Sequence, residues 1–159
     1  MLINQELQLS LPEYLREMSS EEKQKLQMMA EGQGKVFSDE EKHIILSVGW
    51  KRLGGLQNLI VGRLNLVKHM ENAIRVSMEP YRYSLKEQTE WSVGGIPAKG
   101  VRYNYWVLPE NEPETEMRGE SLVVKKGKTI YYLHFYIREN LAAENASLWS
   151  EIVASASWT

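Results

Sequence analysis

The sequence lacks cysteine, has no long apolar run and carries little net charge, and each of these absences excludes a class of protein. Among its 159 residues there is no Cys, so neither disulfide bonds nor thiolate metal sites can form. No stretch approaches the roughly 18 consecutive apolar residues of a membrane span. The formal charge of −2 gives no field to attract nucleic acid or an acidic membrane, so we expect neither as a partner.

The start of the chain also lacks a targeting signal. The first residues, MLINQELQLS, contain no basic segment followed by an apolar run, which a secretory signal peptide requires. We therefore expect a cytoplasmic protein. The length is sufficient for one domain with its own core and too short for two of comfortable size, so we expect residues 1–159 to form a single domain.

Periodicity in the first half predicts alternating strands and helices. A strand at 6–11 precedes a helix at 20–30, which starts at a capping box formed by Ser19 and Glu22. A strand at 43–53 follows, and then a long helix that Gly62 is expected to delay until near Arg63 and Pro80 to end. The first helix would place Leu26, Met29 and Ala30 on one side, and the second has an apolar stripe of Leu56, Ile60, Leu64, Val67, Met70, Ile74 and Met78.

The second half is predicted as a run of strands at 81–93, 98–108, 117–126 and 129–138. Glycines or an acidic loop at 109–116 separate them, and such short connections favour antiparallel hairpins. Asn145 is expected to cap a last helix, which has an apolar face of Leu148, Ile152, Val153 and Ala156. The order β-α-β-α-β-β-β-β-α therefore predicts an α/β (α+β) fold, a mainly antiparallel sheet with helices packed on it.

The stretch KTIYYLHFYIREN, residues 128–140, contains the candidate binding site. Alternate side chains of a strand point to opposite faces, so Tyr131, Leu133 and Phe135 belong to a core face and the other face is semi-polar. Large side chains on both faces indicate a central strand between two helical layers. The strand VRYNYWVL, residues 101–108, alternates similarly. Together the two strands could form a concave surface for a protein partner, made by Tyr132, His134, Tyr136, Arg138, Trp106 and Arg102.

A purely structural role explains the same pattern without any ligand, and the sequence leaves both interpretations open. Because a buried charge is costly unless it is paired, we expect Arg138 to lie near the surface or to pair with a carboxylate, for which Glu120 and Glu90 are candidates.

No catalytic motif is complete. GKT at 127–129 lacks the glycine that a phosphate loop has five positions earlier, and a strand follows it instead of a helix. No serine lies in a G-x-S-x-G elbow, and no pair of carboxylates lies in an apolar setting that would raise a pKa. His43 follows Asp39, Glu40 and Glu41, but acids beside a lone histidine are more often solvated than metal-binding. We therefore expect no catalytic residue, no metal and no cofactor.

Several segments together resemble the PsbP-like superfamily. They are VGGIPAKGVRYNYWV at 93–107, MRGESLVVKKGKTIYYLHFYIREN at 117–140 and LWSEIVASASW at 148–158. In the first half, LPEYL, a helix, ILSVGW and a long helix fit the same order. The superfamily includes the extrinsic photosystem II protein PsbP, the Ran-binding import factor Mog and bacterial Eag-type chaperones of type VI secretion effectors.

The resemblance covers most of the chain and implies a three-layer α/β/α sandwich around a largely antiparallel sheet. Members of the superfamily mostly bind proteins and do not catalyse reactions. No site motif of the family can be matched here, so no residue role is carried over.

We therefore expect a non-enzymatic, cytosolic protein-binding or chaperone-like adaptor that uses the semi-polar aromatic face or the acidic loop. The alternative is a small-molecule or lipid carrier with a pocket between sheet and helix, which a deep apolar cavity near His134 would favour. A hydrolase or metal-dependent enzyme is the third hypothesis, and it would need carboxylates and histidine converging in a cleft. The sequence leaves the partner and the oligomeric state open.

Overall fold

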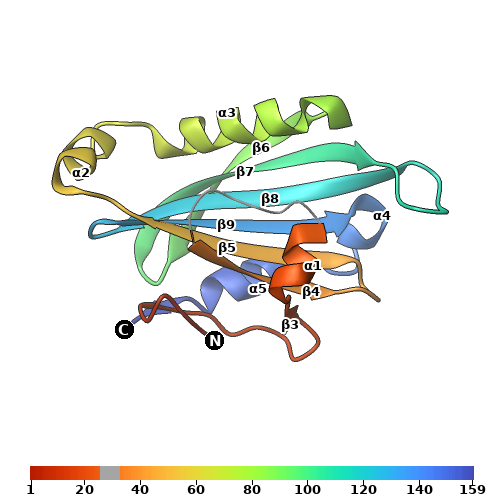
Figure 1. Ribbon diagram of the computed structural model, residues 1–159, viewed down its shortest axis with the longest axis horizontal. Helices are drawn as coiled ribbons and strands as arrows, with labels where there is room; N and C mark the ends of the chain where they lie inside the picture. The colour runs from red at the N-terminus through yellow and green to blue at the C-terminus, as the bar shows by residue number, and fades with distance from the viewer. Residues whose placement is uncertain (26–32) are drawn as a thin grey trace.

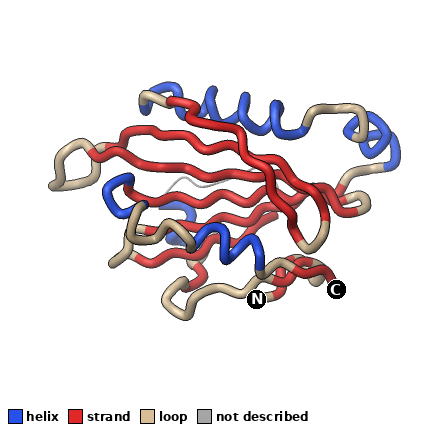
Figure 2. The backbone as a smooth tube through the Cα atoms, turned by 180° about the vertical axis from the view of Figure 1, so that it is seen from behind, coloured by secondary structure: helices blue, strands red, loops and turns tan. Residues whose placement is uncertain are grey.

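The computed structural model describes residues 1–25 and 33–159, and within them a seven-stranded antiparallel sheet carries helices on both faces (Figure 1, Figure 2). The predicted α/β/α sandwich around a mainly antiparallel sheet is confirmed. The strands lie in the order β3-β4-β5-β9-β8-β7-β6. They are β3 (Arg16–Glu17), β4 (Gln33–Asp39), β5 (Ile44–Arg52), β6 (Ser84–Val93), β7 (Ile96–Val107), β8 (Thr115–Lys126) and β9 (Thr129–Arg138).

Strands β6 to β9 form the consecutive hairpins that the sequence predicts. Gly94 and Gly95 turn the chain between β6 and β7 with φ angles of 55° and 86°, a region that glycine enters without steric cost. A longer loop, residues 108–114, joins β7 to β8. β9 pairs with β5 on one side and with β8 on the other, so the aromatic stretch is a central strand, as predicted.

The long helix begins close to the predicted Arg63 and ends before Pro80, as expected, and a separate short helix that was not predicted precedes it. α2 (Gly55–Val61) ends at Gly62, and α3 (Leu66–Met78) begins after Asn65, whose side chain accepts a hydrogen bond from the Lys68 amide at 3.2 Å. A 3₁₀ turn, η1 (Glu79–Tyr81), follows α3. The C-terminal part of the predicted stripe packs on β7 and β8 through Val67, Met70 and Ile74. The prediction is wrong for the N-terminal part, because Leu56, Ile60 and Leu64 are exposed.

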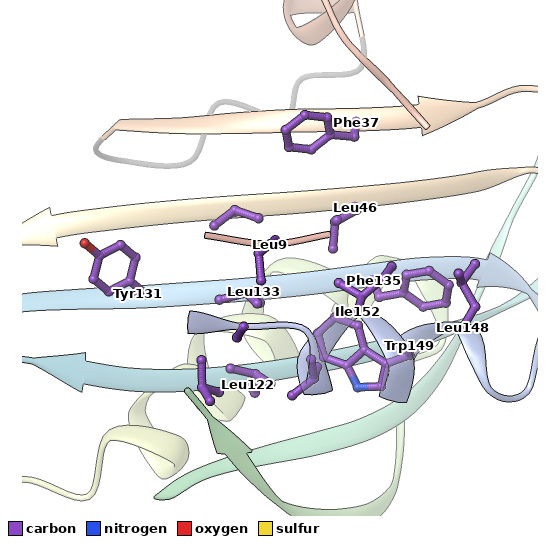
Figure 3. Packing of buried hydrophobic residues seen from close by; sticks show 14 of the residues in the cluster. Leu9, Phe37, Leu46, Leu122, Tyr131, Leu133, Phe135, Leu148, Trp149 and Ile152 are labelled. Carbon is purple, nitrogen blue, oxygen red and sulfur yellow. The ribbon is translucent and has the colours of Figure 1, made fainter. Parts of the chain in front are cut away.

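The opposite face of the sheet carries α5 (Leu148–Ala154), which follows the short α4 (Glu139–Ala142). Figure 3 shows Trp149 and Ile152 of α5 against the core side of β9, where the Trp149 ring stacks on Phe135 at 5.6 Å. The predicted apolar face of this helix is confirmed, because Leu148, Ile152, Val153 and Ala156 are all buried. The predicted cap is wrong: Ser147 occupies the N-cap, and the Asn145 side chain donates to the Leu141 carbonyl.

A small three-stranded sheet brings the two ends of the described chain together. Its strands are β1 (Leu2–Ile3), β2 (Leu7–Gln8) and β10 (Ser157–Trp158), with β2 in the middle. The predicted strand at 6–11 is thus reduced to β2. The indole of Trp158 donates to the Val93 carbonyl at 2.9 Å, which fixes the small sheet to the end of β6. Both figures show the N and C ends side by side (Figure 1, Figure 2).

The capping box at the first helix is confirmed. The Ser19 hydroxyl accepts from the Glu22 amide at 3.2 Å, and the Glu22 carboxylate accepts from the Ser19 amide at 2.7 Å, at the start of α1 (Ser20–Lys25). The predicted continuation with Leu26, Met29 and Ala30 lies outside the described residues. Strand β4 was not predicted, because Val36 and Phe37 are its only large apolar residues and they do not alternate with polar ones. Of the helices in the two described ranges, none has the length and apolar character to cross a membrane.

Candidate functional site

The sheet separates the six predicted binding residues into two groups. Residues directly opposite each other on neighbouring antiparallel strands share a face. Arg102 lies opposite Glu120, which in turn lies opposite the core residue Phe135, so Arg102 belongs to the α5 face, and Trp106 shares it. Tyr132, His134, Tyr136 and Arg138 belong to the α3 face. The structure therefore does not combine them into the single concave surface that we expected.

On the α3 face, side chains of three neighbouring strands form an aromatic cluster, which we define as Tyr103, Tyr105, Ser121, His134 and Tyr136. The Ser121 hydroxyl lies 2.7 Å from Nδ1 of His134 and 3.0 Å from the Tyr103 hydroxyl. The Tyr136 ring stacks on His134 and meets Tyr105 edge-on, each at 6.2 Å between centroids. Burial lowers the pKa of His134 to about 4, so the imidazole is neutral at neutral pH.

A glycine makes room for this cluster. A Cβ atom at Gly119 would lie 2.3 Å from two ring carbons of Tyr103, which is closer than real contacts allow. Tyr103 itself is fully buried, and the ring of Tyr83 packs on it at 5.4 Å. The Tyr83 hydroxyl donates to Glu71 of α3 at 2.9 Å, so the cluster is tied to the helix that covers it.

The Ser121–His134 contact has the residue types of a nucleophile and its base, but it is a structural link. Ser121 is only 1% exposed and lies in the middle of β8, so a substrate has no path to its hydroxyl. The pair escaped the motif search because it depends on the register between two strands. At GKT, Gly127 makes the β8–β9 turn and a strand follows. Among the described residues, no group of three or more His, Asp or Glu side chains is arranged to hold a metal ion.

The space that a carrier would need beside His134 is occupied by side chains. The Tyr136 ring stacks on His134, the Ser121 hydroxyl contacts its Nδ1, and Tyr105 packs edge-on against Tyr136. A depression of about 380 Å³ lies instead where the start of α3 meets the ends of β7 and β8, and it is lined by Leu66, Lys99 and Lys125 among others. This geometry does not favour the carrier alternative.

Arg138 joins the aromatic face to the acidic loop. Its guanidinium makes a bidentate contact with the Glu112 carboxylate, with both N–O distances 2.9 Å, and these hydrogen bonds lower the pKa of Glu112. The expected pairing of Arg138 with a carboxylate is confirmed, but the candidate partners Glu120 and Glu90 are wrong. Glu120 points to the opposite face, and Glu90 lies on β6, which does not adjoin β9.

The acidic loop is also anchored on the α5 face of the sheet. Arg82 contacts the Glu114 carboxylate at 2.5 Å, and its guanidinium lies 4.5 Å from the centre of the Trp106 ring. Arg138 thus holds the loop from one face, and Arg82, whose guanidinium lies over Trp106, holds it from the other. We call this part of the molecule the acidic end; its carboxylates are Asp39, Glu40, Glu41, Glu110, Glu112, Glu114 and Glu116. Sequence reasoning missed Arg82, because its role depends on the conformation of the loop.

Several other charged groups on the α5 face are paired or half-buried. Arg118 donates to both carboxylate oxygens of Glu139, at 2.9 and 2.7 Å, and Arg102 pairs with Glu87 at 2.9 Å. Burial raises the pKa of Glu120 to about 7, although Arg102 and Arg118 act in the opposite direction. From the sequence only pairs of carboxylates were considered, so the raised pKa of Glu120 was not predicted. Its position just before the apolar residues Leu122, Val123 and Val124 was the available signal.

Solved structures with a similar fold agree with the resemblance. Cyanobacterial PsbP (CyanoP) from Synechocystis sp. PCC 6803 is 13% identical and aligns over 97% of this chain and 93% of its own, with a TM-score of 0.63. LpqN, involved in cell envelope biogenesis of Mycobacterium tuberculosis, is 13% identical over 96% of this chain and 83% of its own, with a TM-score of 0.57. A protein from Bacteroides thetaiotaomicron VPI-5482 is 12% identical over 96% of this chain and 45% of its own, with a TM-score of 0.52.

At these identities the likeness shows the fold alone, and the chain has a PsbP-like fold. No protein-family model matches the sequence, and no curated protein does.

Proposed function

We propose that the chain is a non-enzymatic protein-binding adaptor with a chaperone-like role in the cytoplasm, and that its binding surface is the acidic end. The observation that carries the proposal is the double attachment of the acidic loop, through Arg138–Glu112 on one face and Arg82–Glu114 on the other. A solvated hairpin tip needs no such anchors. An anchored loop presents its carboxylates in fixed positions, which is what recognition of a partner requires.

Exposed apolar side chains accompany the carboxylates. Leu108, at the start of the loop, is 78% exposed, and Tyr81, next to Arg82, is also exposed. A surface that combines fixed negative charge with apolar contact area suits a protein partner with basic and apolar residues, because opposite charges steer the encounter and apolar burial stabilises the complex. The resemblance to a superfamily whose members mostly bind proteins supports the same class of function.

The test uses paired variants and cross-linking. Immobilised protein captures partners from a lysate of the source cells, and affinity for the recovered partner is then measured by calorimetry. Leu108→Ser with Glu110→Lys should weaken binding about tenfold or more, since it removes contact area and reverses a charge. The matched control, Leu85→Ser with Glu90→Lys, changes an exposed leucine and an exposed glutamate on β6 and should leave affinity unchanged.

Amine-reactive cross-linking tests the surface independently of affinity. Lys42 lies in the turn beside the acidic end, whereas Lys51 and Lys128 lie at the other end of the sheet. We expect the partner to be cross-linked to Lys42. Cross-links confined to Lys51 and Lys128, or equal loss of binding in the control variant, would refute the proposed surface.

A further inference from the structure

The helix α2 turns its apolar side chains away from the core. None of its residues is buried, and Leu56, Leu59 and Ile60 are 74%, 70% and 53% exposed. Their spacing puts them on one face of the helix. Leu64, three residues after the helix ends, is 42% exposed. We call these four residues the α2 patch. Soluble domains seldom expose so many neighbouring aliphatic side chains unless the surface binds something.

Basic residues surround the α2 patch. Lys51 and Arg52 end β5 immediately before α2, and β9 joins them to the β8–β9 turn through the pairs Lys51–Ile130 and Ile130–Lys125. The Leu53 amide donates to the Lys128 carbonyl at 2.7 Å, which brings that turn to the start of α2. Leu64 lines the same depression as Lys99 and Lys125. The cations of this basic end are Lys51, Arg52, Arg63, Lys68, Lys99, Lys125 and Lys128.

Among the described residues, acidic side chains are sparse at the basic end, although Glu90 of β6 lies directly opposite Lys99. Residues 42–70, 91–109 and 121–138 contain no Asp or Glu. In the part of the chain that the structure describes, the ion pairs involve other cations. Figure 1 shows α2 at the opposite end of the sheet from the loop after β7. The length of β8 separates the two ends by about 36 Å, at roughly 3.3 Å per residue.

We propose that the basic end docks the protein on an anionic lipid bilayer, with the α2 patch inserted among the headgroups. The cations are mostly lysines, which act as hydrated point charges and suit a diffuse anionic surface better than the bidentate recognition of a protein carboxylate. The patch is purely aliphatic, whereas protein interfaces are enriched in aromatic residues and depleted in Lys. A projecting apolar surface ringed by cations is the pattern of interfacial membrane binding.

This inference departs from the expectation that no membrane is bound, which rested on the net charge. A charge of −2 is the sum of two opposite ends and does not describe the field at either one. The acidic end would face away from the bilayer and remain accessible to a protein.

Vesicle flotation tests the inference. The full chain is mixed with vesicles of phosphatidylcholine alone or of phosphatidylcholine with phosphatidylglycerol. We expect binding about tenfold or more tighter to the anionic vesicles, weakening as salt is added. Leu56→Gln with Leu59→Gln should reduce binding about tenfold, and Lys51→Glu with Lys128→Glu should remove the preference for anionic lipid. Leu56, Leu59, Lys51 and Lys128 are all exposed, so folding should be retained.

Matched controls distinguish binding through this surface from non-specific binding of the protein to vesicles. Val76→Gln with Leu85→Gln replaces exposed apolar residues outside the patch, and Lys86→Glu reverses an exposed charge on β6. Both should bind vesicles like the wild type, and so should the acidic-end variant Leu108→Ser with Glu110→Lys. No binding to anionic vesicles, equal binding to neutral ones, or equal loss in the controls overturns the inference. So does a patch variant that binds vesicles normally but no longer captures an acidic protein.

Discussion

Replacing Gly119 with alanine tests the packing of the aromatic cluster. The added methyl would lie 2.3 Å from ring carbons of Tyr103, which is fully buried beneath Tyr83 and cannot move aside freely. Overpacking costs about 1–3 kcal/mol, and a shift of the ring would also weaken its hydrogen bond to Ser121, worth about 1 kcal/mol. Alanine also lowers the conformational entropy of the unfolded chain, which offsets about 0.4–1 kcal/mol of this loss. We expect a net loss of about 2–3 kcal/mol in the free energy of unfolding.

Urea denaturation followed by tryptophan fluorescence measures this loss. Gly49→Ala on β5 is the control, because its Cβ would meet its nearest neighbour at an ordinary 3.6 Å, and the variant should be unchanged or slightly stabilised. On a Tyr103→Val background the collision is gone, so Gly119→Ala should then cost almost nothing, which gives a coupling energy of about 2 kcal/mol. A loss below about 0.5 kcal/mol for the single variant, or additive effects in the double variant, would refute this account of the packing.

Other predictions follow from burial and from the shifted pKa values. Phe135→Ala should cost about 3–5 kcal/mol in urea denaturation, because the ring is 3% exposed and stacks on Trp149; a loss under about 1 kcal/mol would contradict its core position. The pKa of Glu120 is raised to about 7, so its neutral form is favoured on folding: its contribution is fully present below about pH 4.5 and is lost as pH rises through 7. Glu120→Gln should therefore raise the melting temperature at pH 8 and not at pH 4.5, and equal effects at both would count against it. The pKa of His134 is lowered to about 4, so its contribution is present above about pH 6.5 and is lost toward pH 4. His134→Gln should flatten the fall in melting temperature between those values, and an unchanged slope would show that His134 is not its source.

Local patterns predicted the elements whose signals are complete within a few residues. Gly94, Gly95 and Gly127 mark the hairpin turns, and strict alternation in β9 assigned Tyr131, Leu133 and Phe135 to the core. Periodicity failed where it continues through a break. The apolar spacing of Leu56 and Ile60 runs on into α3, but Gly62 separates the helices, and only the tertiary position of α2 decides that its side chains are exposed.

The candidate site depended on relations between strands that no single strand encodes. The alternation of side chains within β7 and within β9 was predicted correctly. Trp106 and Tyr136 nevertheless lie on opposite faces of the sheet, because the pairing of each strand with β8 sets their relative register. The partner of Arg138 was missed for a similar reason. Glu112 lies in a loop, and alternation says nothing about where a loop side chain points. The opposite charges of the acidic end and the basic end could not be predicted from the sequence either, because they become evident only when the strands are aligned in the sheet.

The pairing of β2 with β10 makes folding depend on contacts across almost the whole sequence. Leu7 pairs with Trp158, and the Thr159 amide donates to the Glu6 carbonyl at 2.9 Å. Closing a loop of about 150 residues costs about 4 kcal/mol in chain entropy, which is far more than the few local contacts of such short strands return early in folding. We therefore expect this sheet to form after the main hairpins have collapsed. Substitutions in it should accelerate unfolding and leave the folding rate nearly unchanged, so this small sheet would act as a kinetic latch on the finished domain.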